Sequence, residues 1–189
     1  MRRLSARSCG ALHDRFRVRD WFRFLLFFMA FFVPAFDGMK AAGRAGLATG
    51  WVVGAALFFG FGLPAILCRH CPHYARKGPV IVCPSAVGPP KLWRACPERP
   101  VGKTEKILFA AGFGAVLLFP FPVLIMGGEA LWAGLALVGA IIFIFSELKF
   151  SCSKCVNFTC LLNRVAAEVK AGYENDRRKS LGLNPPERR

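Results

Sequence analysis

Several signatures of catalysis are missing from this chain of 189 residues. It has no GxGxxG turn, no Walker phosphate loop, no HExxH zinc-protease motif and no GxSxG nucleophile elbow. The sequence therefore contains no familiar motif for dinucleotide binding, phosphoryl transfer, metalloproteolysis or acyl transfer. An enzyme is the less expected class, and no catalytic residue is assigned.

Acidic residues are also scarce, with 11 Asp and Glu against 26 Lys and Arg and a net charge of +15. Glu129 and Glu147 lie at the ends of apolar runs, not deep inside them. Ion and proton pathways normally require a charged group within the membrane, so transport is not favoured. Anionic lipid headgroups account for the positive charge more simply than nucleic acid does, and no nucleic-acid partner is expected.

Long apolar runs, in contrast, are abundant: 54% of the residues are hydrophobic and the mean hydropathy is +0.41. A spanning helix needs about 20 apolar residues. The runs Ala45–Cys68, Ile107–Gly128 and Ala130–Ser146 carry no charge. A shorter run, Phe24–Phe36, reaches a spanning length if Arg23 is an end residue whose guanidinium extends to the interface. The sequence predicts four transmembrane helices, at about 21–39, 45–67, 107–127 and 130–147.

The distribution of basic residues predicts the orientation. Seven Lys and Arg precede the first apolar run, eight lie between the second and third, and nine follow the fourth, whereas the loop 37–44 holds two. The positive-inside rule then places both termini and the loop 68–106 in the cytoplasm, in the inner membrane if the cell is bacterial. All eight cysteines fall on this side, where thiols normally stay reduced.

The predicted fold is an all-α integral membrane protein, a four-transmembrane-helix bundle with a cysteine-rich, mostly irregular cytoplasmic cap and an amphipathic C-terminal helix. Pro and Gly in the middle loop exclude a long helix there, although "PVIV" suits one short strand. Pro120 and Pro122 should interrupt the third helix. The expected organisation is a basic N-terminal segment (1–20), a membrane domain (21–147) containing the Cys-rich loop (68–106), a Cys-rich juxtamembrane segment with the amphipathic helix (148–175), and a disordered basic tail (176–189).

Three glycines, Gly46, Gly50 and Gly54, recur four residues apart and lie on one face of the second helix. Small residues on one face allow helix backbones to approach closely in lipid. Packing inside the bundle is the favoured interpretation of this face, and a homo-oligomer contact is the alternative.

Two CxxC motifs are the most specific chemical signal. Cys68–Cys71 in "CRHC" and Cys152–Cys155 in "CSKC" each follow a helix that runs toward the cytoplasm. Packed helices lie about 8–10 Å apart, so short loops suffice to bring both motifs together. Two such turns form the four-thiolate arrangement of a structural zinc site, with sulfurs about 3.7–3.8 Å apart. These four cysteines are the primary predicted ligands.

A weaker prediction concerns four further candidates, which either form a second site or surround the first: Cys83, Cys96, Cys160 and His73. Each has a simpler interpretation, because cysteine often packs as a small apolar residue and a loop histidine often only hydrogen-bonds. Cys9, in the Arg-rich N-terminal segment, has no partner in sequence and is treated as a free thiol.

The functional hypothesis is a multi-pass membrane protein whose cytoplasmic face is organised by a thiolate metal site, with zinc expected, in a structural or interaction role. The alternative is a membrane redox protein that uses an iron–sulfur cluster or a reactive CxxC dithiol, since thiolates also hold such clusters. The bilayer with its anionic headgroups is the expected partner.

The orientation has a direct test. A cytoplasmic C-terminus predicts that a reporter active only in the periplasm is silent when fused after Arg189, whereas a reporter active only in the cytoplasm gives signal. The opposite pattern would contradict the positive-inside assignment.

Overall fold

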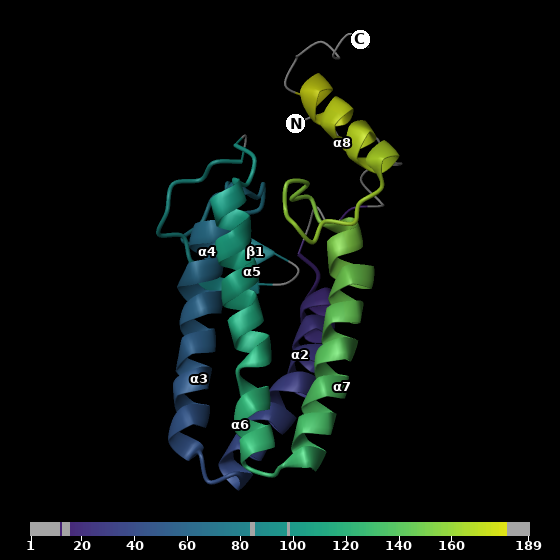
Figure 1. Cartoon of the computed structure of the whole chain (residues 1–189). Coiled ribbons are helices and arrows are strands. Elements are labelled where there is room, and N and C mark those ends of the chain that lie inside the picture. The colour runs from purple at the N-terminus through teal and green to yellow at the C-terminus, as the bar shows by residue number, and fades with distance from the viewer. Residues whose placement is uncertain (1–11, 13–15, 84–85, 98, 181–189) are drawn as a thin grey trace.

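The computed structural model describes residues 12, 16–83, 86–97 and 99–180. In that part of the chain four helical segments are long and apolar enough to cross a membrane: Val18–Ala41, Ala45–His70, Lys103–Met126 and Ala130–Lys154. They alternate in direction along the bundle (Figure 1). In the most apolar 18-residue stretch of each segment only 22–28% is buried inside the protein. Many large apolar side chains are therefore exposed on the outside of the bundle. The predicted four-helix pattern of a multi-pass membrane protein is confirmed for the described residues.

The first span is a single helix, α2, and the other three contain breaks. In chain order the elements are α2 (Val18–Ala41), α3 (Ala45–Leu57), the π-turn η1 (Phe58–Gly62), α4 (Leu63–Ile66), the 3-10 turn η2 (Cys68–His70), β1 (Val80–Cys83), β2 (Ala86–Pro90), α5 (Lys103–Leu118), α6 (Pro120–Met126), α7 (Ala130–Ser146), the π-turn η3 (Glu147–Ser151), the 3-10 turn η4 (Cys152–Lys154) and α8 (Ala167–Ser180).

Proline accounts for two of these breaks. Pro64 has no N–H to donate to the preceding turn, and the π-turn η1 lies directly before it. Pro120 separates α5 from α6, as predicted for the "PFP" sequence. The connections 42–44 and 127–129 lie at one end of the bundle, and the segments 68–102 and 147–166 lie at the other (Figure 1). The second end, which carries both CxxC motifs, is called the thiol end below.

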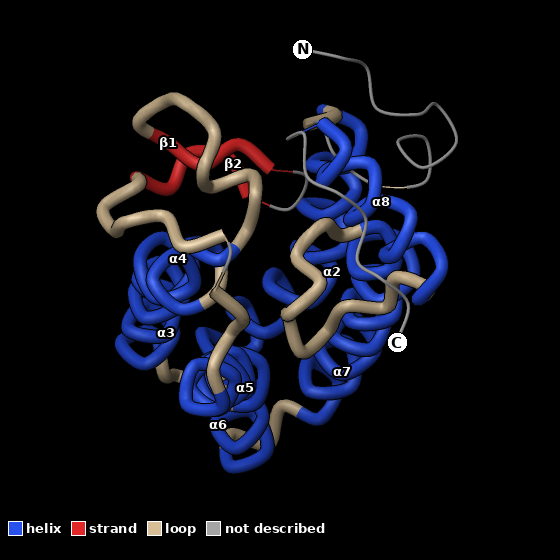
Figure 2. The backbone as a smooth tube through the Cα atoms, turned by 90° about the horizontal axis from the view of Figure 1, so that it is seen from above, coloured by secondary structure: helices blue, strands red, loops and turns tan. Residues whose placement is uncertain are grey.

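The middle loop contains a β-hairpin. Strand β1 includes the "VIV" of the predicted strand and pairs antiparallel with β2, with Val82 opposite Val87. The sequence did not indicate β2, because its "AVGPP" carries the residues that usually exclude strands. In a view down the bundle the hairpin lies on the side of α4 (Figure 2), and β2 contacts η1.

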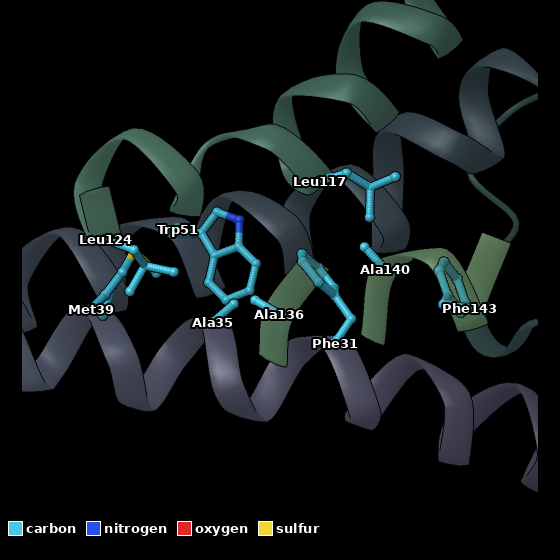
Figure 3. Packing of buried hydrophobic residues seen from close by; sticks show 10 residues of the cluster. Phe31, Ala35, Met39, Trp51, Leu117, Leu124, Ala136, Ala140 and Phe143 are labelled. Atoms are coloured by element: carbon cyan, nitrogen blue, oxygen red, sulfur yellow. The ribbon is translucent and has the colours of Figure 1, made fainter. Parts of the chain in front are cut away.

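The core of the bundle forms where α2 and α7 pack closely together. Phe31, Ala35, Ala136, Ala140 and Phe143 are buried in one cluster (Figure 3). Gly139 faces the backbone of α2 so closely that a Cβ would overlap main-chain atoms of Ala30 and Phe31. Small residues let two helices approach in lipid, where van der Waals packing replaces the hydrophobic effect as the driving force.

A second contact joins α3 to α5. The buried indole of Trp51 donates from Nε1 to the carbonyl of Val116 at 2.9 Å. Such a bond satisfies the indole N–H inside an apolar environment, where an unpaired donor is costly. The donor and the acceptor lie 65 residues apart, so this bond fixes the second span against the third.

The glycine face of α3 does not pack inside the bundle. A Cβ placed on Gly46, Gly50 or Gly54 would meet no atom within 4 Å. All three line an apolar groove of about 420 Å³ between α3 and α5. The favoured prediction of intramolecular packing is therefore wrong for these residues, because the close helix contact uses Gly139 instead. Their role in a homo-oligomer stays a prediction.

The C-terminal helix begins later than the apolar spacing indicated. Leu161 and Leu162 lie in a turn, and α8 starts at Ala167. Val169 and Tyr173 of α8 pack against a buried cluster that contains Cys71 and Val156, so the helix contacts the Cys-rich segments. Helix α8 continues to Ser180, into the segment predicted to be a tail, and residues 181–189 lie outside the described residues.

Two glycine substitutions should separate the packed face from the open one. Gly139→Ala should lower the free energy of unfolding by about 1–3 kcal/mol, because its Cβ overlaps the α2 backbone. The matched variant Gly50→Ala should leave stability unchanged or raise it by up to about 1 kcal/mol through helix propensity. Unfolding in detergent micelles by denaturant measures both, and equal losses would contradict the assigned interface.

Candidate thiolate site

The two CxxC motifs have the same local structure at the ends of the second and fourth spans. In each, the first three residues form a 3-10 turn, η2 or η4, and the second cysteine is extended, with φ −93° and ψ 140° at Cys71 and φ −77° and ψ 130° at Cys155. The two motifs therefore share one backbone shape, a tight turn that ends in an extended cysteine.

Tertiary contacts hold the two motifs near each other. The Asn157 side chain, just after the second motif, donates from Nδ2 to the carbonyl of Leu67, just before the first, at 3.4 Å. Cys71 and Val156 belong to one buried cluster. Cys160 packs against another cluster that contains Leu67. The segments that follow the second and fourth spans are thus neighbours, although about 80 residues separate them in sequence.

Electrostatic interactions show which thiols lie together. Cys155 is within electrostatic range of five others: Cys68, Cys71, Cys83, Cys152 and Cys160. Cys68 and Cys71 each interact in turn with Cys83 and Cys160. These six residues are called the thiol cluster below. Cys83 and Cys160 therefore accompany the four primary candidates.

Two of the secondary candidates are placed differently. The thiol of Cys96 is directed at the carbonyl of Arg94 at 3.6 Å, and its backbone N–H donates to the carbonyl of Arg69 at 2.7 Å. His73 is buried, and its backbone N–H donates to the sulfur of Cys71. Cys9 lies outside the described residues.

Backbone N–H groups point at three sulfurs of the thiol cluster. His73 donates to Cys71, Asn157 donates to Cys155 at 3.4 Å, and Leu162 donates to Cys160. In each case a donor lies two residues after the cysteine. Hydrogen bonds of this kind favour the thiolate over the thiol. Where a metal is bound, hydrogen bonds of this kind also orient its ligands.

Burial acts in the opposite direction on the free thiols. It raises the pKa of Cys71 well above the ordinary thiol value and the pKa of Cys155 to about 12, and the neighbouring thiolates add to both increases. Burial also raises the pKa of Cys160. A reactive dithiol requires a lowered pKa, because the thiolate is the nucleophile. A raised pKa is the direction typical of buried, unreactive thiols.

The sequence did not single out Glu105, a buried carboxylate at the centre of an ion cluster. Its Oε1 contacts Arg69 at 2.5 Å, His70 at 3.2 Å and Arg99 at 3.6 Å, and its Oε2 accepts from the backbone N–H of Gly102 at 2.7 Å. The one available signal was the "GKTE" stretch, with Glu at the third position of a helix, as in a capping box. The long-range partners had no signature in sequence.

The described residues show no metal-coordination geometry. Among the described residues, no group of three or more His, Cys, Asp or Glu side chains is arranged to hold a metal ion. None of the seven described cysteines forms a disulfide. Convergence of Cys68, Cys71, Cys152 and Cys155 on one ion therefore stays a prediction, while the donor set itself, soft thiols held in paired turns, fits zinc or an iron–sulfur cluster.

Comparison with known proteins gives no match: no family model, no curated protein and no solved structure is similar to this chain.

Thiol reactivity tests the environment of the cysteines. With metals chelated, Cys71, Cys155 and Cys160 of the folded protein should react with iodoacetamide at pH 8 more slowly than in the unfolded protein, and Cys155 at least about tenfold more slowly. The reason is that the thiolate fraction falls tenfold for each unit by which the pKa rises. The rate should increase as the pH rises above 9. Mass spectrometry of the labelled peptides measures it, and faster labelling in the folded protein would indicate an activated dithiol.

Proposed function

We propose that this chain is a multi-pass membrane protein whose thiol cluster binds zinc, and that the ion organises the thiol end in a structural or interaction role. The observation that supports this most strongly is the pair of CxxC turns with matching backbone conformation, whose segments are joined by the hydrogen bond from Asn157 to Leu67. A structural zinc ion takes four thiolates in a tetrahedron, and two turns supply two each.

The expected ligands are Cys68 and Cys71 from the first turn and Cys152 and Cys155 from the second. Zinc supplies the positive charge that lets several thiolates remain deprotonated side by side in a buried site, because coordinated thiols lose their protons. The N–H donors at Cys71 and Cys155 would then bond to charged sulfurs, which strengthens them. Cys83 and Cys160 lie beside these four and are available to a second ion or to an exchange of ligands.

A membrane-surface role is consistent with the charges at the same end. Exposed basic side chains surround the thiol end: Arg76, Lys77, Arg94, Arg99, Lys103 and Lys154. Each basic residue near an anionic bilayer surface contributes about 1 kcal/mol of attraction. Anionic headgroups are accordingly the proposed lipid partner of this end. The orientation itself rests on the positive-inside rule.

Elemental analysis of protein purified in detergent tests the proposal. We expect about one zinc ion per chain, as for a structural four-thiolate site. The double variant Cys68→Ser/Cys155→Ser should lose it, because it removes one sulfur from each turn. Cys96→Ser is the matched control and should keep it, since that thiol points at a backbone carbonyl.

Two results would contradict zinc. Iron together with visible absorption would replace it with an iron–sulfur cluster on the same thiolates, because a zinc–thiolate protein is colourless. Protein that contains no metal after expression and purification in zinc-supplemented medium would overturn the metal site altogether.

A further inference from the structure

The buried carboxylate of Glu105 connects helix α5 to the first CxxC turn. Arg69 and His70 are the two residues between Cys68 and Cys71, and both contact the same oxygen, Oε1, at 2.5 and 3.2 Å. Glu105 lies in the first turn of α5 and is 9% exposed, and His70 is 3% exposed. The two side chains that separate the cysteines are therefore both anchored on one atom of a neighbouring helix.

Further bonds fix this carboxylate in place. Its other oxygen accepts from the backbone N–H of Gly102 at 2.7 Å, and the Nδ1 atom of His70 lies 2.9 Å from the carbonyl of Arg99. A buried charge is tolerated only when it is paired and hydrogen-bonded, and the loss of one partner leaves the others uncompensated. The cluster thus behaves as one unit.

The second CxxC turn is held in a different way. The hydroxyl of Ser153, between Cys152 and Cys155, donates to the carbonyl of Lys149 at 2.5 Å, four residues earlier in the same span. That bond is local, whereas the Glu105 contacts reach 35 and 36 residues along the chain. The orientation of the first turn consequently depends on the position of α5. That of the second depends on its own helix and on the segment just after it, because the backbone N–H of Arg164 donates to the carbonyl of Cys152 at 3.0 Å and Nδ2 of Asn163 donates to the carbonyl of Cys155 at 2.9 Å.

We propose that Glu105 is a positioning residue for metal binding: it holds Arg69 and His70 so that the sulfurs of Cys68 and Cys71 face the thiol cluster. This role rests on the proposed function, since it concerns the same site. Outer-shell partners of metal ligands typically contribute 10–100-fold to metal affinity. Binding is reciprocal, so an ion held by the first turn also stabilises the contact of that turn with the first turn of α5.

The experiment is a competition between the full-length protein in detergent and a colorimetric zinc chelator. We expect Glu105→Gln and Arg69→Gln each to weaken zinc binding 10–100-fold relative to the unchanged protein. The double variant should bind zinc as tightly as whichever single variant has the lower zinc affinity, because both substitutions remove the same ion pair. Glu129→Gln, in the turn at the opposite end, is the matched control and should leave the affinity unchanged.

The outcomes separate this inference from the zinc proposal. If the unchanged protein binds zinc and Glu105→Gln stays within twofold of it, the positioning role is overturned and the zinc site stands. The positioning role is also overturned if the two single losses of zinc affinity multiply in the double variant. Multiplying losses mean that the two residues act independently, as in a general loss of stability, and not through one shared contact. An unchanged protein that binds no zinc overturns both. If Glu105→Gln is not recovered as a folded protein, Arg69→Gln decides by the same twofold threshold.

Discussion

The close contact between α2 and α7 is the interaction on which the rest of the bundle depends. Lipid is as apolar as a leucine side chain, so helices in a membrane associate through close packing more than through burial of apolar area. Ala35 on α2 and Ala136, Gly139 and Ala140 on α7 provide the small surface that this packing needs. At the thiol end the guanidinium of Arg23 lies over the ring of Phe150 at 4.5 Å, which extends the contact to the turn before Cys152.

Two pairs of helices meet at the thiol end. The α2–α7 pair carries the second CxxC motif, and the second and third spans, joined by the Trp51 bond and by Glu105, carry the first. The amide of Asn157 crosses between them to Leu67. In the proposed function a metal ion adds a stronger link at the same place, and each pair contributes two thiolates. Such an ion joins membrane helices without requiring further apolar contact between them.

The sequence predicted the spans well because the signal is a bulk property. Uncharged runs of spanning length such as Ala45–Cys68 have few alternatives, since in lipid every backbone polar group must bond within its own helix. The break at Pro120 and the strand around Val80–Cys83 also follow from local chemistry. Prediction was wrong for Gly46, Gly50 and Gly54, because a small-residue face shows where a helix is able to pack and not which neighbour it meets.

What the sequence determined by itself is thus the number and order of the spans and the location of both CxxC motifs at helix ends. Each of these depends on residues that are adjacent in the chain or on simple periodicity. Only the tertiary structure decided that Gly139 packs against the backbone of α2, that Cys83 and Cys160 interact electrostatically with Cys68, and that Glu105 contacts the first turn. Those facts depend on distances between residues far apart in sequence, and no local pattern of residues encodes such a distance.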